Sequence, residues 1–178
     1  RSTLFPYTTL FRSSIDCGVR AADFLYDFCQ RAPEELAGNA ICPSHYMGVA
    51  ELYRETGDKK YLDLLRQFID IRGMVVNGTD DNQDRIPFRQ QYQAMGHAVR
   101  ANYLYAGVAD LFIESGEEQL MKNLTSIWKD ITTRKMYLNG ACGALYDGTS
   151  PDGTNYKPDS IQKVHQSYGR IEDRKSVV

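Results

Sequence analysis

Cysteine and histidine are scarce in this sequence, with four cysteines and three histidines among 178 residues. No two cysteines form a Cys-x-x-Cys pair, and their spacing fits neither a zinc ligand pattern nor a disulfide framework. We therefore expect reduced thiols that are mostly buried, as free cysteines commonly are. The four are Cys17, Cys29, Cys42 and Cys142.

Charge of one sign and long apolar runs are also missing. The formal net charge is −2 and no basic run stands out, which argues against a nucleic-acid partner. No apolar stretch reaches the roughly 18 residues of a membrane span, so we expect no membrane partner. The sequence shows no signal-peptide pattern, no Gly-rich phosphate loop and no nucleophile elbow. The length suits one globular domain.

The two ends of the chain show no helical or strand periodicity that continues into the neighbouring sequence. Residues 1–13 and 171–178 resemble translated sequencing-adapter text. We interpret them as non-native tails and leave them out of the functional interpretation. The natural segment then covers residues 14–170.

An internal repeat organises the middle of the chain. The stretch GVAELYRETGD at 48–58 returns as GVADLFIESGE at 107–117. Each copy predicts a helix that ends at a glycine in the left-handed conformation, Gly57 or Gly116, followed by a second helix. Acidic residues open that second helix, where the helix dipole favours negative charge.

The predicted helices alternate in polarity. Those at 58–72 and 117–135 are amphipathic, and the first carries seven charges among fifteen residues. Those at 43–56 and 92–113 are poorer in charge, as expected for helices buried on most sides. Pairs of one buried and one half-exposed helix build either a solenoid or an α/α toroid, so the sequence predicts an all-α fold.

Three other segments complete the expected fold. A further helix is predicted at 16–32. The polar link at 77–90 contains Pro87, which breaks any helix there. The stretch 135–148 switches towards a period of two with glycines at turn points, which predicts a short β-hairpin.

Two of the three histidines carry the functional hypothesis. His97 lies on the apolar stripe of its helix, and the repeat places His45 on the same inward-facing side. Both are either structural core histidines or ligands in the cavity of a toroid. Polar and aromatic side chains that suit a sugar pocket gather nearby: Gln83, Arg85, Arg89, Gln90, Gln91, Tyr92, Arg100, Asn102, Tyr103 and Tyr105.

No pair of catalytic carboxylates can be identified, although such pairs are the usual machinery of glycoside hydrolysis. The acidic residues of the link, Asp80, Asp81 and Asp84, are expected to be solvated. The repeat-equivalent Glu51 and Asp110 are expected to be structural. We expect the charge of Arg100 to be paired with a carboxylate.

Four stretches together resemble glycoside hydrolase family 127, the β-L-arabinofuranosidase-like group. In order they are CPSHYMGVAELYRETGDKKYLDLLRQFIDIRG, PFRQQYQAMGHAVRANYLYAGVADL, KMYLNGACGALYDG and VHQSYGR. The resemblance implies a fragment of an (α/α)6 barrel that is followed by a β-rich domain. It also implies a retaining hydrolase of terminal arabinofuranose-like sugars on plant-type glycans, with a zinc-bound cysteine nucleophile and a glutamate acid/base.

The resemblance also implies roles for individual residues. His97 matches the family's sugar-contacting histidine in Gly-His-Ala-Val-Arg, and Gln90 stands where many relatives have glutamate. Many relatives read His-Pro-Glu where this chain has Cys42-Pro43-Ser44-His45, so the histidine is displaced. Gln166 stands at the position of the acid/base glutamate. The expected substrate-binding residues are His97, Gln91, Arg89, His45, His165 and Tyr168.

The zinc ligands and the nucleophile of the family lie beyond this chain, and Cys142 lacks their neighbouring pattern. The resemblance thus implies zinc in the full-length protein, no metal in this fragment, and no activity of the isolated chain. Two alternatives stay open. Gln166 and Cys42 are compatible with a family member of diverged chemistry, and the repeat is compatible with a non-catalytic helical binding module.

Overall fold

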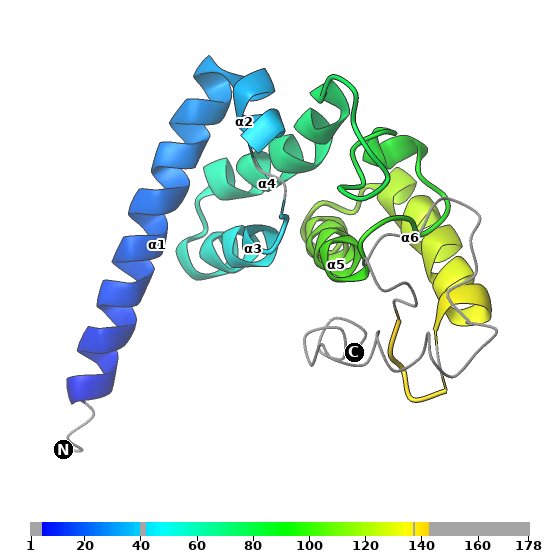
Figure 1. Cartoon of the computed structure of the whole chain (residues 1–178). Helices are drawn as coiled ribbons and strands as arrows, with labels where there is room; N and C mark the ends of the chain where they lie inside the picture. The colour runs from blue at the N-terminus through cyan, green and yellow to red at the C-terminus, as the bar shows by residue number, and fades with distance from the viewer. Residues whose placement is uncertain (1–4, 40–41, 137, 143–178) are drawn as a thin grey trace.

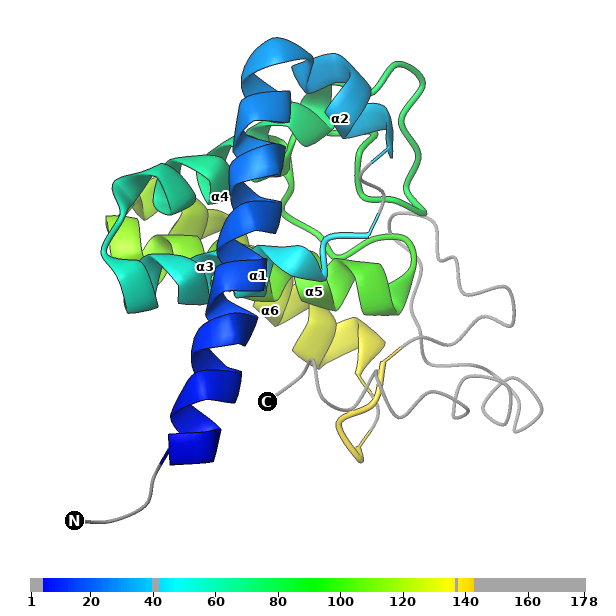
Figure 2. The same cartoon turned by 90° about the vertical axis from the view of Figure 1, so that its left-hand side faces the viewer.

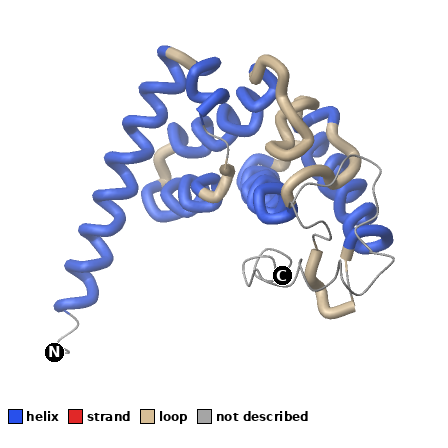
Figure 3. Tube along the Cα trace, in the orientation of Figure 1, coloured by secondary structure: helices blue, strands red, loops and turns tan. Residues whose placement is uncertain are grey.

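A computed structural model describes residues 5–39, 42–136 and 138–142 (Figure 1). In these residues it contains helices and turns but no named strand, as the sequence predicts (Figure 3). The α-helices are α1 (Phe5–Arg31), α2 (Pro33–Asn39), α3 (His45–Thr56), α4 (Lys59–Ile71), α5 (Ala98–Ser115) and α6 (Glu118–Asp130). Two 3₁₀ turns, η1 (Arg72–Met74) and η2 (Phe88–Gln90), and one π turn, η3 (Ile131–Lys135), complete the set.

The repeat folds as two helix pairs, α3–α4 and α5–α6. The first helix of each pair ends at a glycine in the left-handed conformation, Gly57 with φ 70° and Gly116 with φ 69°. Their N–H groups donate to the carbonyls of Tyr53 and Phe112, which satisfies the last turn of each helix. The second helix then begins after Asp58 or Glu117, and the Asp58 side chain accepts from the Lys60 N–H. The predicted glycine caps are confirmed, and both outer helices lie within their predicted ranges, with 131–135 forming η3.

The helices form two layers. The inner helices α3 and α5 pack side by side, while α4 packs across both and α6 packs on α5 (Figures 1 and 2). Nine of the eighteen residues of α5 are buried, as its low charge predicts. The outer helix α4 buries one apolar stripe, which includes Tyr61, Leu64, Leu65, Phe68 and Ile69. Each such side chain contributes about 1.5–3 kcal/mol of stabilisation by leaving water.

A glycine on α5 sets the distance between the two inner helices. A Cβ atom added to Gly107 would lie 2.6 Å from the Cβ atom of Tyr46 on α3. Tyr46 is itself buried, stacks on Phe68 and donates a hydrogen bond to the Phe68 carbonyl. The repeat-equivalent Gly48 on α3 has no described atom within 4 Å of such a Cβ. The equivalent glycines of the repeat therefore differ: Gly107 on α5 is tightly packed, whereas Gly48 on α3 has free space beside it.

Substitution of Gly107 by alanine is expected to lower the free energy of unfolding by about 1–3 kcal/mol, because the added methyl group overpacks the α3–α5 contact. Gly48→Ala is the matched control. It is expected to raise the free energy of unfolding by about 0.5–1 kcal/mol, since alanine stabilises an unobstructed helix interior. Urea unfolding followed by circular dichroism measures both. Equal effects of the two substitutions would contradict the assigned packing.

An ion cluster ties together the inner helices near their C-terminal ends. The Arg54 guanidinium contacts Glu51 at 2.5 Å on its own helix, and Asp110 at 2.9 Å and Glu114 at 2.6 Å on α5. Hydrogen bonds to these carboxylates, that of Glu114 first, raise the pKa of Arg54. The structural roles predicted for Glu51 and Asp110 are confirmed.

The start of α5 differs from the prediction. A helix is predicted from residue 92, whereas α5 begins at Ala98. Gly96 adopts a φ of 75°, which interrupts any regular helix. The N–H groups of Ala94 and Met95 bind the side chains of Asp130 and Tyr105 in place of helical carbonyls. The prediction is confirmed from residue 98 onwards and is wrong for 92–97, which form a loop.

α1 passes without a break through residues 5–13, where the sequence shows no helical period, and the foreign origin of these residues stays a prediction. An antiparallel bridge joins Met136 and Cys142 within the predicted hairpin, whose residues 143–148 lie outside the described part. None of the described helices combines the length and the apolar character that crossing a bilayer requires.

Candidate functional site

The N-terminal ends of the two inner helices lie on the same side of the molecule (Figure 2). His45 is the first residue of α3, and His97 is the N-cap residue of α5. Both side chains are half-buried. Because α3 and α5 are parallel, both histidines lie on the side of the helix layer where the inner helices begin, which we call the histidine rim. The Tyr46–Gly107 contact places the start of α3 level with the middle of α5, so His97 lies about two helical turns further out than His45.

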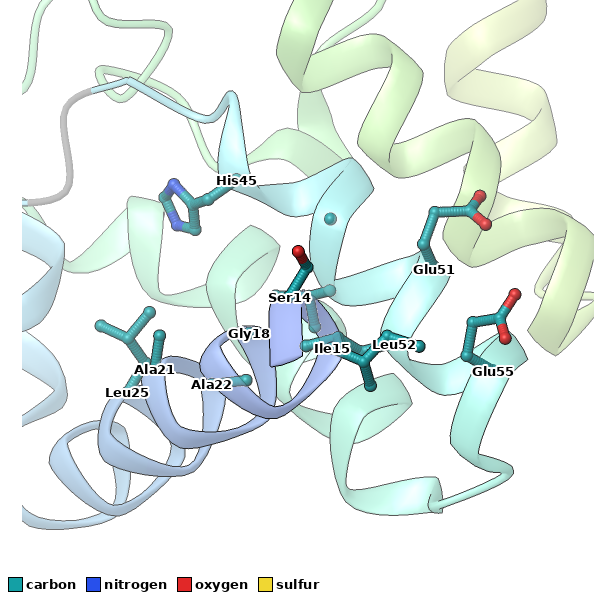
Figure 4. Close-up of a pocket in the computed structure, with 12 residues that line it drawn as sticks. Ser14, Ile15, Gly18, Ala21, Ala22, Leu25, His45, Glu51, Leu52 and Glu55 are labelled. Atoms are coloured by element: carbon teal, nitrogen blue, oxygen red, sulfur yellow. The ribbon is translucent and has the colours of Figure 1, made fainter. Parts of the chain in front are cut away.

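His45 packs against buried aromatic side chains on one side and lines a pocket on the other. Its ring packs edge-on against Tyr46, with 4.9 Å between centroids, and against Phe68, at 4.8 Å. On its other side it lines a cavity of about 530 Å³ between α1 and α3 (Figure 4). Burial lowers the pKa of His45, the charge of Arg72 adds to this, and a backbone hydrogen bond at Cys42 partly opposes it. The imidazole is thus held neutral at pH 7.

The lowered pKa of His45 gives a pH dependence of stability. The unfolded chain, with an ordinary histidine pKa near 6.5, takes up the proton before the folded chain does. The contribution of His45 to the free energy of unfolding is therefore complete above about pH 6.5 and is lost as the pH falls towards the lower pKa of the folded state. Wild-type chain is expected to lose more stability between about pH 7.5 and pH 5 than His45→Leu, measured by urea unfolding. Parallel pH profiles would contradict this.

The backbone of His97 is held from both sides by the link that precedes it. The His97 N–H donates to the Asp81 carbonyl at 3.2 Å. Its carbonyl accepts from the Ala101 N–H at 2.9 Å and from the Gln83 amide at 3.3 Å. A Cβ atom at the neighbouring Gly96 would lie 1.6 Å from the Asp80 carbonyl oxygen, so only glycine fits there.

The acidic residues of the link are structural, and the expectation that they are simply solvated is wrong. Asp80 pairs with Arg85 at 2.7 Å, and Asp81 pairs with Arg100 at 2.5 Å. Asp84 is buried and accepts from the Thr79 N–H at 2.6 Å. The predicted pairing of Arg100 with a carboxylate is confirmed, and Asp81 is the partner.

Arg89, predicted to bind substrate, forms ion pairs within the fold. Its guanidinium contacts Asp70 of α4 at 2.8 Å and Glu117 at the start of α6 at 2.9 Å. Hydrogen bonds to these two carboxylates, Asp70 first, raise the pKa of Arg89. Burial alone raises the pKa of Glu117, but hydrogen bonds from Arg66 and Arg89 bring it below its usual value. Arg89 therefore joins the outer helices.

Gln91, also predicted to bind substrate, is 1% exposed. Its amide nitrogen donates to the carbonyls of Gln83 at 3.0 Å and Ile86 at 2.6 Å. Asn123 on α6 donates to the carbonyls of Arg89 and Gln91, at 3.2 and 2.7 Å. The backbone of Arg89 and Gln91 is therefore bound to α6, and both side chains form contacts within the fold.

A polar stripe on α6 and η3 holds residues 92–94, and little in the amino-acid pattern indicated it. Ser126 donates to the Tyr92 carbonyl at 2.8 Å, and Asp130 accepts from the Ala94 N–H at 2.9 Å. Lys135 is fully buried, donates to the Ala94 carbonyl, and lies 3.5 Å from Asp130. The available signal was an asparagine, an aspartate and a lysine on the apolar side of an amphipathic helix, where buried polar groups need partners.

The cysteines follow the sequence expectation only in part. Cys29 and Cys142 are buried, but Cys17 and Cys42 are exposed. Asn102 of α5 donates to the Cys142 sulfur at 3.1 Å. No group of three or more potential metal ligands occurs among the residues that the structure describes.

Gln166, His165 and Tyr168, the other predicted site residues, lie outside the described residues. Their predicted roles stay predictions. Of the predicted set, the described structure brings His45 and His97 to the histidine rim and Arg89 and Gln91 to the surface of α6.

Comparison with known proteins gives a family match over most of the chain. Residues 9–170 match the family described as Beta-L-arabinofuranosidase, GH127 catalytic domain. A non-reducing end β-L-arabinofuranosidase of Bifidobacterium longum subsp. longum is 36% identical over 129 residues, which are 61% of this chain and 20% of that protein.

Solved structures agree in fold. One named glycoside hydrolase is 75% identical with a TM-score of 0.72, and the match covers 87% of this chain and 26% of the other. A GH127 β-arabinofuranosidase is 40% identical with a TM-score of 0.56, covering 58% of this chain and 16% of the other. The described helices are thus part of an α/α barrel, as predicted. The chain spans between 16% and 26% of the length of these relatives.

Proposed function

This chain belongs to the GH127 β-L-arabinofuranosidase family, and we propose that the complete protein is a glycoside hydrolase that removes terminal β-L-arabinofuranose-like sugars from plant-type glycans. The observation that carries the proposal is the family match over residues 9–170, because it includes both inner helices and the link between them. The matched Bifidobacterium relative is named for the same activity at a non-reducing end.

His97 and His45 are the proposed sugar contacts of this chain. Their placement on the same side of the helix layer, each at the N-terminal end of an inner helix, supports this. A neutral imidazole has one donor and one acceptor nitrogen, which suits a sugar hydroxyl because the hydroxyl also donates and accepts. The lowered pKa of His45 keeps it in this neutral form. Arg89 and Gln91 hold the link in place, Arg89 through Asp70 of α4 and Glu117 before α6, and Gln91 through the Gln83 carbonyl.

Zinc is proposed as a cofactor of the complete protein on family grounds alone. The described residues do not fit a zinc site, because no group of three potential ligands occurs among them. No step of the proposed reaction is therefore assigned to a metal held by this part of the chain. Metal analysis of the purified complete protein tests the proposal, and absence of zinc from active enzyme would contradict it.

An aryl β-L-arabinofuranoside tests the activity directly. The complete protein is expected to release the aryl group from this substrate and not from the matching α-L-arabinofuranoside. The 178-residue chain alone is expected to release none. Hydrolysis of a different aryl glycoside in a panel would favour a member with diverged specificity. Binding of arabinose without hydrolysis of any panel member would overturn the enzymatic proposal.

A further inference from the structure

Gln83 is the most heavily bonded side chain of the link. It is fully buried and has a φ of 55°, which is uncommon for a residue other than glycine. Its amide nitrogen lies 3.3 Å from the Asp80 carbonyl and 2.9 Å from the Asp81 carbonyl. It also lies 3.1 Å from the Met95 carbonyl and 3.3 Å from the His97 carbonyl. All four neighbours are acceptors, which fixes the amide with its nitrogen towards them.

These contacts cross-link two segments that are separated in sequence. Asp80 and Asp81 belong to the link, while Met95 and His97 flank Gly96 at the entrance to α5. Three of these carbonyls also accept from a backbone N–H: that of Asp80 from Gln83, that of Asp81 from His97, and that of His97 from Ala101. The Gln83 amide is nevertheless the donor that the two segments share, and its loss would let the 95–97 segment move away from 80–81.

The other bonds of the link do not replace this one. The Asp81 carbonyl accepts from the His97 N–H, and the Arg100–Asp81 ion pair holds the same aspartate against α5. Both fix the link relative to the first turn of the helix. The Gln83 amide, by contrast, reaches the carbonyls on both sides of Gly96, which set the direction of the chain into His97.

We propose that Gln83 is a positioning residue that sets the location of the His97 imidazole at the histidine rim. The proposal rests on the proposed function, in which His97 contacts the sugar. A group that binds substrate must be held within about 0.5 Å of its productive place by neighbours that are themselves fixed. A displacement of about 1 Å costs on the order of 100-fold in rate, so an amide that never touches substrate controls activity through His97.

A double-mutant cycle in the complete protein tests this. Gln83→Met keeps the length and the unbranched shape of the side chain but removes the donor. Gln83→Met, His97→Ala and the double variant are assayed for kcat/KM on an aryl β-L-arabinofuranoside, and for thermal midpoint. Gln83→Met is expected to lower kcat/KM by about 10–100-fold in wild type and by less than about 2-fold in His97→Ala. The fall in thermal midpoint is expected to be equal in both backgrounds.

A control variant separates positioning from general damage to the link. Asp84 is buried in the same segment, and its side chain holds the Thr79 N–H rather than the 95–97 segment. Asp84→Ala is therefore expected to lower the thermal midpoint and to change kcat/KM by less than about 3-fold. Equal losses of kcat/KM from Asp84→Ala and Gln83→Met would overturn the proposal. So would an equal loss from Gln83→Met with and without His97.

The sugar contact and the positioning role can fail separately. If His97→Ala retains wild-type kcat/KM, the proposed sugar contact is wrong. A crystal structure of the Gln83→Met protein then decides the positioning role. A displacement of His97 by about 1 Å or more supports it, and an unchanged His97 overturns it. If Gln83→Met does not fold, Gln83→Glu, which donates one hydrogen when protonated, takes its place in the same cycle.

Discussion

Replacement of Gly96 by alanine is expected to lower the free energy of unfolding by more than about 3 kcal/mol. Two causes add. The φ of 75° places a non-glycine residue in a sparsely populated region, and the new Cβ atom would lie 1.6 Å from the Asp80 carbonyl oxygen. The obstacle is backbone and cannot rotate away as a side chain does. The link must therefore separate from the loop before α5, which also displaces His97.

Gly116→Ala is the control for the Gly96 prediction. Gly116 has a similar φ of 69°, but no described atom lies within 4 Å of an added Cβ. This substitution is expected to cost only about 1 kcal/mol, the conformational part of the effect. Urea unfolding measures the difference between the two variants. Similar losses in both would mean that Gly96 and Asp80 are not in contact.

Substitution of Asp130 by asparagine is expected to have the second large effect, a loss of about 3–5 kcal/mol in the free energy of unfolding. Asp130 is buried and accepts from the Ala94 N–H, Arg134 and Lys135. The neutral amide offers a single acceptor oxygen. It removes the carboxylate charge that lies 3.5 Å from the fully buried Lys135 ammonium, and a buried charge that loses compensation is costly.

An exposed aspartate on the other outer helix provides the matched control. Asp63 pairs with Arg66 at 2.8 Å, as Asp130 pairs with Arg134, but its side chain is 54% exposed. Asp63→Asn is expected to cost less than about 1 kcal/mol, and its small effect is expected to vanish in high salt. The Asp130→Asn loss is expected to persist in high salt. A loss from Asp130→Asn that disappears with salt would contradict the buried placement.

The sequence was sufficient for the helix pairs because their signals are local. Gly57 and Gly116 stop the inner helices within two residues of the predicted ends, and the apolar stripe of α4 is buried as predicted. The apolar side of α6 is buried only in part, since Met121 is 41% and Trp128 is 52% exposed. The periodicity indicates which face is apolar, but not whether a neighbour covers it.

The site was less accessible to sequence reasoning because its contacts join side chains to distant backbone. His45 and His97 were placed on one side by the repeat, and the structure puts them at one rim. Nothing in the pattern indicates that the Gln83 amide reaches the His97 carbonyl. Likewise, Arg89 looks like a pocket residue in sequence because its partner Asp70 lies nineteen positions away on another helix.

The contact of Tyr46 with Gly107 also determines a direction. Tyr46 has a repeat counterpart in Tyr105, as Gly107 has one in Gly48, so each inner helix carries both halves of the same joint. Such a contact is head-to-tail, because the tyrosine of one helix packs against the glycine of the next helix. Since the two partners differ, the contact requires neighbouring inner helices to point in the same direction. The side of the layer on which both inner helices begin, and with it the side that carries both histidines, is therefore set by a tyrosine–glycine contact between α3 and α5.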